Sequence, residues 1–177
     1  MKTIITWFIF ILLFILIPSC TCRQNNPEAE FVEEQSTETS IDSRSYNLGV
    51  IGAFAEVVDI GIKRLALSAP LSPEEMDALI EDALHIAENN SVKIYREEDF
   101  LITDLFPAEI TRGKHVLLIY KDPVKQEYLK LKTNKRQLVQ SGQYNGAARE
   151  TIARSLGKLL SYPKEKIDAL LNESGNQ

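Results

Sequence analysis

One loop in the second half of the chain gathers three side chains that can bind an anion. The stretch "EITRGKHV" (residues 109–116) holds Arg112, Lys114 and His115 around Gly113, a residue that permits an unusual backbone. Arginine can hold a carboxylate or phosphate at two points, and lysine adds a point charge. We interpret the stretch as a candidate binding loop, with an ordinary solvated connection as the alternative.

A second stretch, "SGQYNGAARE" (residues 141–150), is a glycine loop that enters a predicted helix near Arg149. The free N–H groups of a helix start attract anions, and a cation in the first turn is locally unfavourable. Arg149 is therefore a further candidate for binding an anionic ligand. The alternative is a plain loop in which Asn145 caps the helix.

Asp104 is the fifth candidate, because the pattern of "DFLITDLF" (residues 99–106) predicts a strand. Strand alternation would place Asp104 on one face with large apolar residues, and buried carboxylates concentrate at functional sites. In the alternative reading the opposite set faces inward and Asp104 is solvated. The two sets are Phe100, Ile102 and Phe106 with Asp104, and Leu101, Thr103 and Leu105.

Several kinds of catalysis find no support in the sequence. There is no HExxH, GxSxG or Walker motif, and no GxGxxG follows a strand. The chain has two histidines, His85 and His115, far apart in sequence. We therefore predict no metal site and no cofactor, and the catalytic residues, if there are any, are unknown.

The two cysteines, Cys20 and Cys22, follow an apolar run from Ile4 to Pro18. That run is shorter than the roughly 17–25 residues of a membrane-spanning helix and suits a secretory signal. A disulfide between them would close a very small, strained ring. A metal site needs more ligands, and a redox CxxC motif needs another spacing.

The residues Leu16-Ile17-Pro18-Ser19-Cys20 resemble a bacterial lipobox, with an aliphatic residue three before the cysteine and a small residue directly before it. Pro18 departs from the usual residue there. The resemblance implies a signal peptide over residues 1–19 and a diacylglyceryl thioether on Cys20. It also implies a lipid-anchored protein of the bacterial cell envelope. Acidic charge directly after a lipidated cysteine can act as a surface-export signal in some bacteria, but here the first acidic residue is Glu28. We therefore expect the periplasmic face. An uncleaved membrane anchor is the alternative.

Residues 20–44 read as the lipidated cysteine and a flexible acidic tether. From residue 23 to 44 the chain holds six acidic residues, two arginines and three large apolar residues. Such a composition buries too little surface to offset the entropy of ordering. We assign residues 45–177 to a single globular domain.

The charge of this domain is divided between its two halves. Residues 45–111 hold 13 acidic and 4 basic residues, while residues 112–166 hold 13 basic and 4 acidic ones. Either the halves fold against each other and their fields partly cancel, or the basic half faces an anionic partner. Outside the cytoplasm nucleic acid is not expected as that partner.

Helical periodicity is clearest in "SPEEMDALIEDALHIAENN", where Ser72, Pro73 and Glu75 form a predicted capping box. Its apolar stripe is predicted to comprise Met76, Leu79, Ile80, Ala83, Leu84 and Ala87, with His85 exposed. A helix from Val50 to Leu67 is also predicted, with the rival reading that Gly61 ends it and "IKRLALSA" is a strand. Further helices are predicted at 123–139, 147–160 and 163–171.

Three strands are predicted, at residues 91–96, 99–106 and 115–120, and "HVLLIY" is apolar enough for a central strand. Short links favour antiparallel neighbours. The sequence therefore predicts an α+β fold, a small and mainly antiparallel sheet of about three strands covered by four to five helices. The runner-up is an α/β unit whose first strand is "IKRLALSA".

These observations favour a non-enzymatic binding lipoprotein, anchored in the membrane, for an anionic small molecule, a glycan or an envelope protein. The rival is a lipid-anchored enzyme, such as a hydrolase with Asp104 or His115 as general base. Convergence of the candidate residues in one concave pocket would favour the enzyme. A third hypothesis is an assembly protein whose divided charge drives self-association.

Overall fold

A three-stranded antiparallel sheet lies at the centre of residues 42–106 and 108–174, the residues that the computed structural model describes. Its strands stand in the order β1 (Leu65–Leu67), β3 (Val116–Tyr120), β2 (Lys93–Glu97). Every residue of β3 is buried, as the apolar run "HVLLIY" predicted. The prediction of a strand at 91–96 is likewise confirmed by β2.

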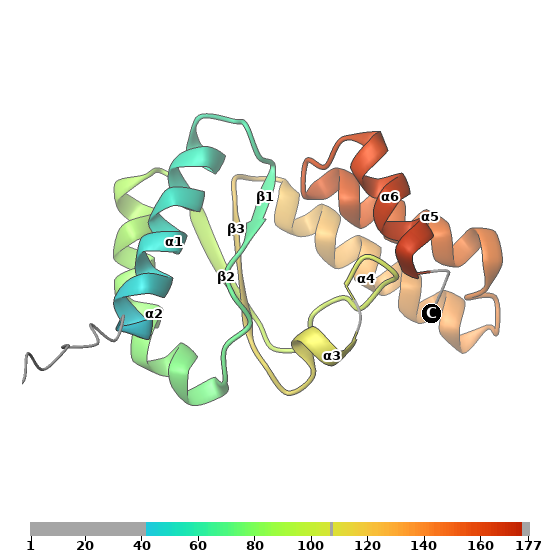
Figure 1. The fold of residues 1–177 in the computed structure, drawn as a ribbon, viewed down its shortest axis with the longest axis horizontal. Coiled ribbons are helices and arrows are strands. Elements are labelled where there is room, and N and C mark those ends of the chain that lie inside the picture. Colours follow the sequence, from blue (N-terminus) through green and yellow to red (C-terminus); the bar gives the residue numbers. More distant parts are fainter. Residues whose placement is uncertain (1–41, 107, 175–177) are drawn as a thin grey trace, which may run out of the picture. The chain divides into compact units, whose positions relative to one another are not determined.

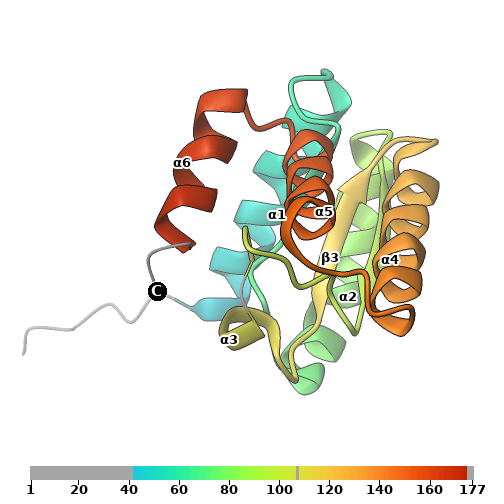
Figure 2. The same cartoon turned by 90° about the vertical axis from the view of Figure 1, so that its right-hand side faces the viewer.

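Helices cover both faces of this sheet (Figure 1). Alternate side chains of β3 point to opposite faces, so Leu117 and Ile119 meet α1 and α2, while Leu118 and Tyr120 meet α4 and α5. Figure 2 shows α1 and α4 on the two sides of β3. The helices are α1 (Ser43–Asp59), α2 (Pro73–Asn89), α3 (Ala108–Thr111), α4 (Val124–Gln140), α5 (Gly146–Leu159) and α6 (Lys164–Ser174). The α+β class and the antiparallel sheet are confirmed.

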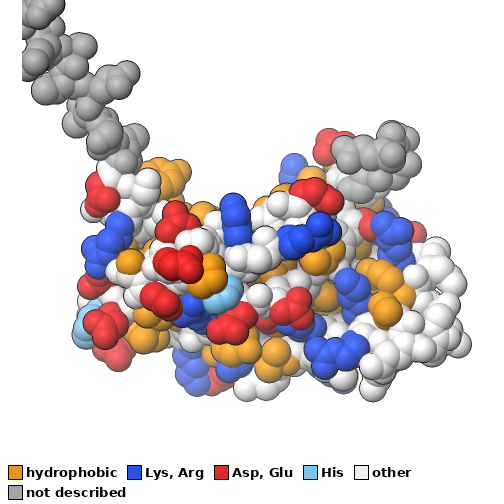
Figure 3. Space-filling model, turned by 90° about the horizontal axis from the view of Figure 1, so that it is seen from below, with side chains coloured by type: hydrophobic (Ala, Val, Ile, Leu, Met, Phe, Trp, Pro, Cys, Tyr) orange, Lys and Arg blue, Asp and Glu red, His pale blue; other side chains and the backbone are white. Residues whose placement is uncertain are grey.

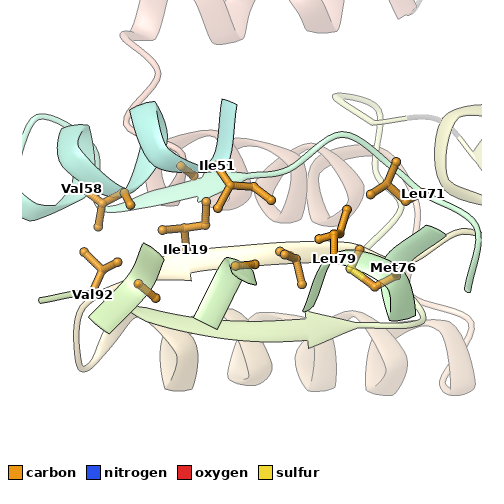
Figure 4. Close-up of a cluster of buried hydrophobic side chains, with 12 residues drawn as sticks. Ile51, Val58, Leu71, Met76, Leu79, Val92 and Ile119 are labelled. Carbon is orange, nitrogen blue, oxygen red and sulfur yellow. The ribbon is translucent and has the colours of Figure 1, made fainter. Parts of the chain in front are cut away.

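The layer of α1 and α2 is held by one cluster of buried apolar side chains (Figure 4). Ile51 and Val58 of α1 point into the same cluster as Met76 and Leu79 of α2, with Val58 opposite Val92, and Ile119 joins the cluster from the sheet. Burying each such side chain stabilises the fold by about 1.5–3 kcal/mol. A second cluster around Leu118, Tyr128 and Leu156 holds α4 and α5 on the other face.

The capping box of α2 is confirmed. The Ser72 hydroxyl accepts from the N–H of Glu75, and the Glu75 carboxylate accepts from the N–H of Ser72 at 2.8 Å. The stripe prediction was wrong at one position, because Leu84 is 46% exposed. The half-buried Ile86 packs against the core from α2 instead.

The prediction that one helix reaches Leu67 was wrong, and the rival reading of a strand holds. Helix α1 ends at Asp59 because Gly61 adopts φ +79°, a left-handed conformation that glycine tolerates. The N–H of Ile62 then donates to the carbonyl of Val57 at 3.1 Å, which closes the last turn. Strand β1 follows within the predicted "IKRLALSA".

Residues 99–106 do not form the predicted strand. They make an irregular segment with a tight turn, in which the main chains of Thr103 and Phe106 bond to each other. They pair with none of the three strands of the sheet, and their apolar side chains pack against α4 and α5 instead. Phe100, Leu101, Thr103 and Leu105 are nonetheless buried.

The predicted signal peptide, Cys20, Cys22 and most of the predicted tether lie outside the described residues. Helix α1 starts at Ser43, two residues before the predicted start of the domain. Asp42 caps this helix by accepting from the N–H of Ser45 at 3.0 Å. None of the helices in residues 42–106 and 108–174 is long and apolar enough to cross a membrane.

Candidate functional site

Two of the five predicted site residues meet in the structure. Arg149, in the first turn of α5, donates from Nε to Oδ1 of Asp104 at 2.8 Å, and its Nη2 donates to the same oxygen. Residues 99–106 and α5 are thereby joined across the α4–α5 layer. The ion pair raises the pKa of Arg149 through this hydrogen bond and the charge of Asp104.

The hollow around this pair has a volume of about 480 Å³ and mixed charge. Lys135 lies against the ring of Tyr144, 5.1 Å from its centroid, and donates to the carbonyl of Ile102 at 2.7 Å. Burial lowers the pKa of Lys135 and raises the pKa of Tyr144. The charged residues that line this hollow are two cations and three carboxylates: Lys135, Arg149, Asp104, Glu109 and Glu173. This balance does not favour an anionic ligand.

The other three predicted site residues lie elsewhere. Arg112 and Lys114 are exposed in the turn between α3 and β3, where Gly113 adopts φ +70°. His115 is half-buried, and its Nδ1 accepts from Nε of Arg96 at 2.8 Å. None of the three lines the hollow that contains Asp104 and Arg149.

A larger groove runs between α4 and α5, with a volume of about 760 Å³. Residues three or four apart share one face of a helix, and such a stripe of α4 lines one wall. Ser155, Lys158 and Leu159 of α5 repeat the same spacing on the other wall, and Arg64 closes one end. The α4 stripe comprises Glu127, Lys130, Leu131, Asn134 and Gln137.

This groove is positively charged. Arg64 donates to Glu127 at 2.6 Å, so these two side chains neutralise each other. Lys130 and Lys158 are exposed, and within the described part of the chain neither has a carboxylate within ion-pair distance. The amides of Asn134 and Gln137 also line the groove and supply neutral donors and acceptors.

The acidic and the basic half of the sequence form helices on opposite faces of the sheet. Helix α2 has six acidic residues and no lysine or arginine, while α4 has five cations and one acid. Some cations of the basic half do pair with the acidic half, as Lys121 does with Asp59 and Lys132 with Glu97. Figure 3 shows more acidic side chains on the side of α1 and α2. The fields therefore cancel only in part.

Sequence reasoning missed the groove residues, since Lys130, Asn134, Gln137 and Lys158 read as the solvent face of two helices. The signal that could have found them is the excess of cations over acids along 124–140. Among the described residues, no group of three or more His, Cys, Asp or Glu side chains could hold a metal ion.

Comparison of the chain with protein-family models, with curated proteins and with solved structures found no match.

Proposed function

We propose that this chain is a lipid-anchored binding protein of the bacterial cell envelope, and that its α4–α5 groove binds an anionic ligand. The observation that carries the proposal is the groove itself, in which Lys130 and Lys158 face the same space with no acidic partner among the described residues. Each ammonium group there is open to a carboxylate, sulfate or phosphate of a ligand.

An acidic glycan is the ligand class that best suits the groove. The lysines can bind its charged groups, and the amides of Asn134 and Gln137 can donate to and accept from its hydroxyls. Leu131 and Leu159 supply an apolar floor on which a sugar ring can lie. The shape suits an elongated ligand, because both walls follow helices.

The alternative of a hydrolase has less support. Asp104 is engaged by Arg149, and His115 accepts from Arg96 in a different part of the domain. The two candidate bases therefore do not share one pocket. A binding role needs neither of them.

The test is calorimetric titration of the protein with a uronic-acid oligosaccharide, beside the neutral oligosaccharide of equal length. We expect the acidic one to bind more tightly, with an affinity that falls as salt rises. Lys130→Gln and Lys158→Gln should each weaken binding about fivefold, or about 1 kcal/mol.

The matched control is Lys166→Gln, an exposed lysine of α6 outside the groove, which should leave the affinity within about twofold. Arg112→Gln serves as a second comparison, because it tests the binding loop at 109–116. The groove proposal fails if Arg112→Gln weakens binding and the two groove variants do not, or if neutral and acidic oligosaccharides bind equally.

A further inference from the structure

The three phenylalanines that the structure describes, at positions 54, 100 and 106, all line one hollow. Phe54 comes from α1, on one side of the sheet, whereas Phe100 and Phe106 come from the irregular segment on the other side. Tyr162, between α5 and α6, adds a fourth ring. The volume is about 230 Å³, and the space is more enclosed than the α4–α5 groove.

The hollow lies at the free edge of β1. Ser68 donates to the carbonyl of Leu117, and Ala66 stands opposite Ile119, so these residues face β3. In an antiparallel pair the residue between them directs its own main-chain groups away from the partner strand. The N–H and carbonyl of Leu67 therefore point away from β3. Leu67 also lines the hollow at this edge of the sheet.

Among the residues that the structure describes, Lys63 is the one charged residue that lines this apolar space. Its Nζ donates to the carbonyl of Leu160 at 2.9 Å and lies 5.1 Å from the centroid of the Tyr162 ring. Burial lowers the pKa of Lys63. Among the described residues no carboxylate lies within ion-pair distance of it. A partly buried charge without a counter-ion is unfavourable, and an anion would relieve that cost.

A second polar side chain lines the same hollow. Thr111, at the end of α3, is only 6% exposed. A few polar groups in a largely apolar hollow are the usual features of a small-molecule site.

We propose that this hollow binds a small amphipathic carboxylate, with the carboxylate at Lys63 and its apolar body among Phe54, Phe106 and Tyr162. The site is separate from the α4–α5 groove and does not depend on the function proposed for it. An apolar cavity of about 150 Å³ holds one benzene molecule. A hollow of about 230 Å³ therefore takes a ring with a short chain, or a medium-length alkyl chain.

The experiment is NMR titration of the full chain with phenylpropanoate, beside phenylpropanol and acetate. The alcohol keeps the apolar body without the charge, and acetate keeps the charge without the body. We expect phenylpropanoate to bind about tenfold more tightly than the alcohol, and acetate not to compete at equal concentration. Contacts between ligand protons and the rings of Phe54 and Phe106 should locate it.

The variant Lys63→Gln should reduce the affinity for phenylpropanoate to that for phenylpropanol, while leaving the affinity for the alcohol unchanged. Retained binding of the alcohol would show that the hollow is intact. Lys166→Gln is the charge-matched control and should change neither affinity. The proposal is overturned if the acid and the alcohol bind wild type equally, if Lys63→Gln has no effect, or if the ligand contacts other residues.

Discussion

Glu97 is the most deeply buried carboxylate described, and Lys132 supplies its counter-ion. Its side chain is 5% exposed, and Oε1 accepts from Nζ of Lys132 at 2.9 Å and from the N–H of Asp99 at 2.9 Å. Oε2 has no hydrogen-bond partner among the described residues. Burial, and then the charge of Glu97, raise the pKa of the nearby Tyr128. Lys132 therefore stabilises the junction between β2 and α4.

We expect Lys132→Met to destabilise the domain by about 3–5 kcal/mol, because it leaves a buried carboxylate without its counter-ion. Denaturant unfolding measures the effect. Lys130→Met is the control on the same helix, and its exposed side chain should matter by about 0.5 kcal/mol or less.

The double variant Glu97→Gln with Lys132→Met should recover much of the loss, since it removes both charges together. Equal stability of Lys132→Met and Lys130→Met would show that Glu97 is not held as an ion pair.

At the scale of single elements, α2 contains two leucines that both belong to the predicted apolar stripe but differ in burial. Leu79 is 2% exposed and Leu84 is 46% exposed. Leu79→Ala should therefore destabilise the domain by about 2–5 kcal/mol through the cavity that it leaves. Leu84→Ala should matter by less than about 1 kcal/mol, and thermal or denaturant melts compare the two directly. A larger loss for Leu84→Ala would mean that the exposed side of α2 is covered in solution.

The elements that sequence predicted correctly are those whose signals are local. Ser72 and Glu75 mark the start of α2 by the bonds they make to each other, and the apolar run of β3 needs no further context. The rival interpretation of a strand after Gly61 was also local, because it followed from Lys63, Leu65 and Leu67 sharing one face.

The failures concern relations between distant segments. "DFLITDLF" alternates like a strand, but a strand needs a partner, and in the structure this segment packs its side chains against α4 and α5 without pairing with the sheet. Leu84 fits the apolar stripe by spacing, yet only the packing of α1 and the sheet determines which side of the stripe is covered. The groove depends on the packing of α4 against α5, and the sequence of neither helix indicates that contact.

At the scale of the whole molecule, the proposed anchor at Cys20 can be tested independently of the groove. If Cys20 is the lipidated residue, an acyl-chain probe should label the wild-type protein and the Cys22→Ala variant, and should not label Cys20→Ala. Gel fluorescence of the labelled protein measures this. Labelling of both variants to the same extent would rule out Cys20 as the anchor.

The separation of the acidic helix α2 from the basic helix α4 by a sheet gives the domain a permanent electric dipole. Net charge sets the long-range force on a molecule, and the chain carries −5, so an anionic surface repels it weakly. Within a Debye length of about 8–10 Å from such a surface, the electric field of the surface also exerts a torque on the dipole. That torque turns α4 toward negative charge and α2 away from it. The domain would thus meet an anionic polymer or membrane already oriented, with the mouth of the α4–α5 groove leading.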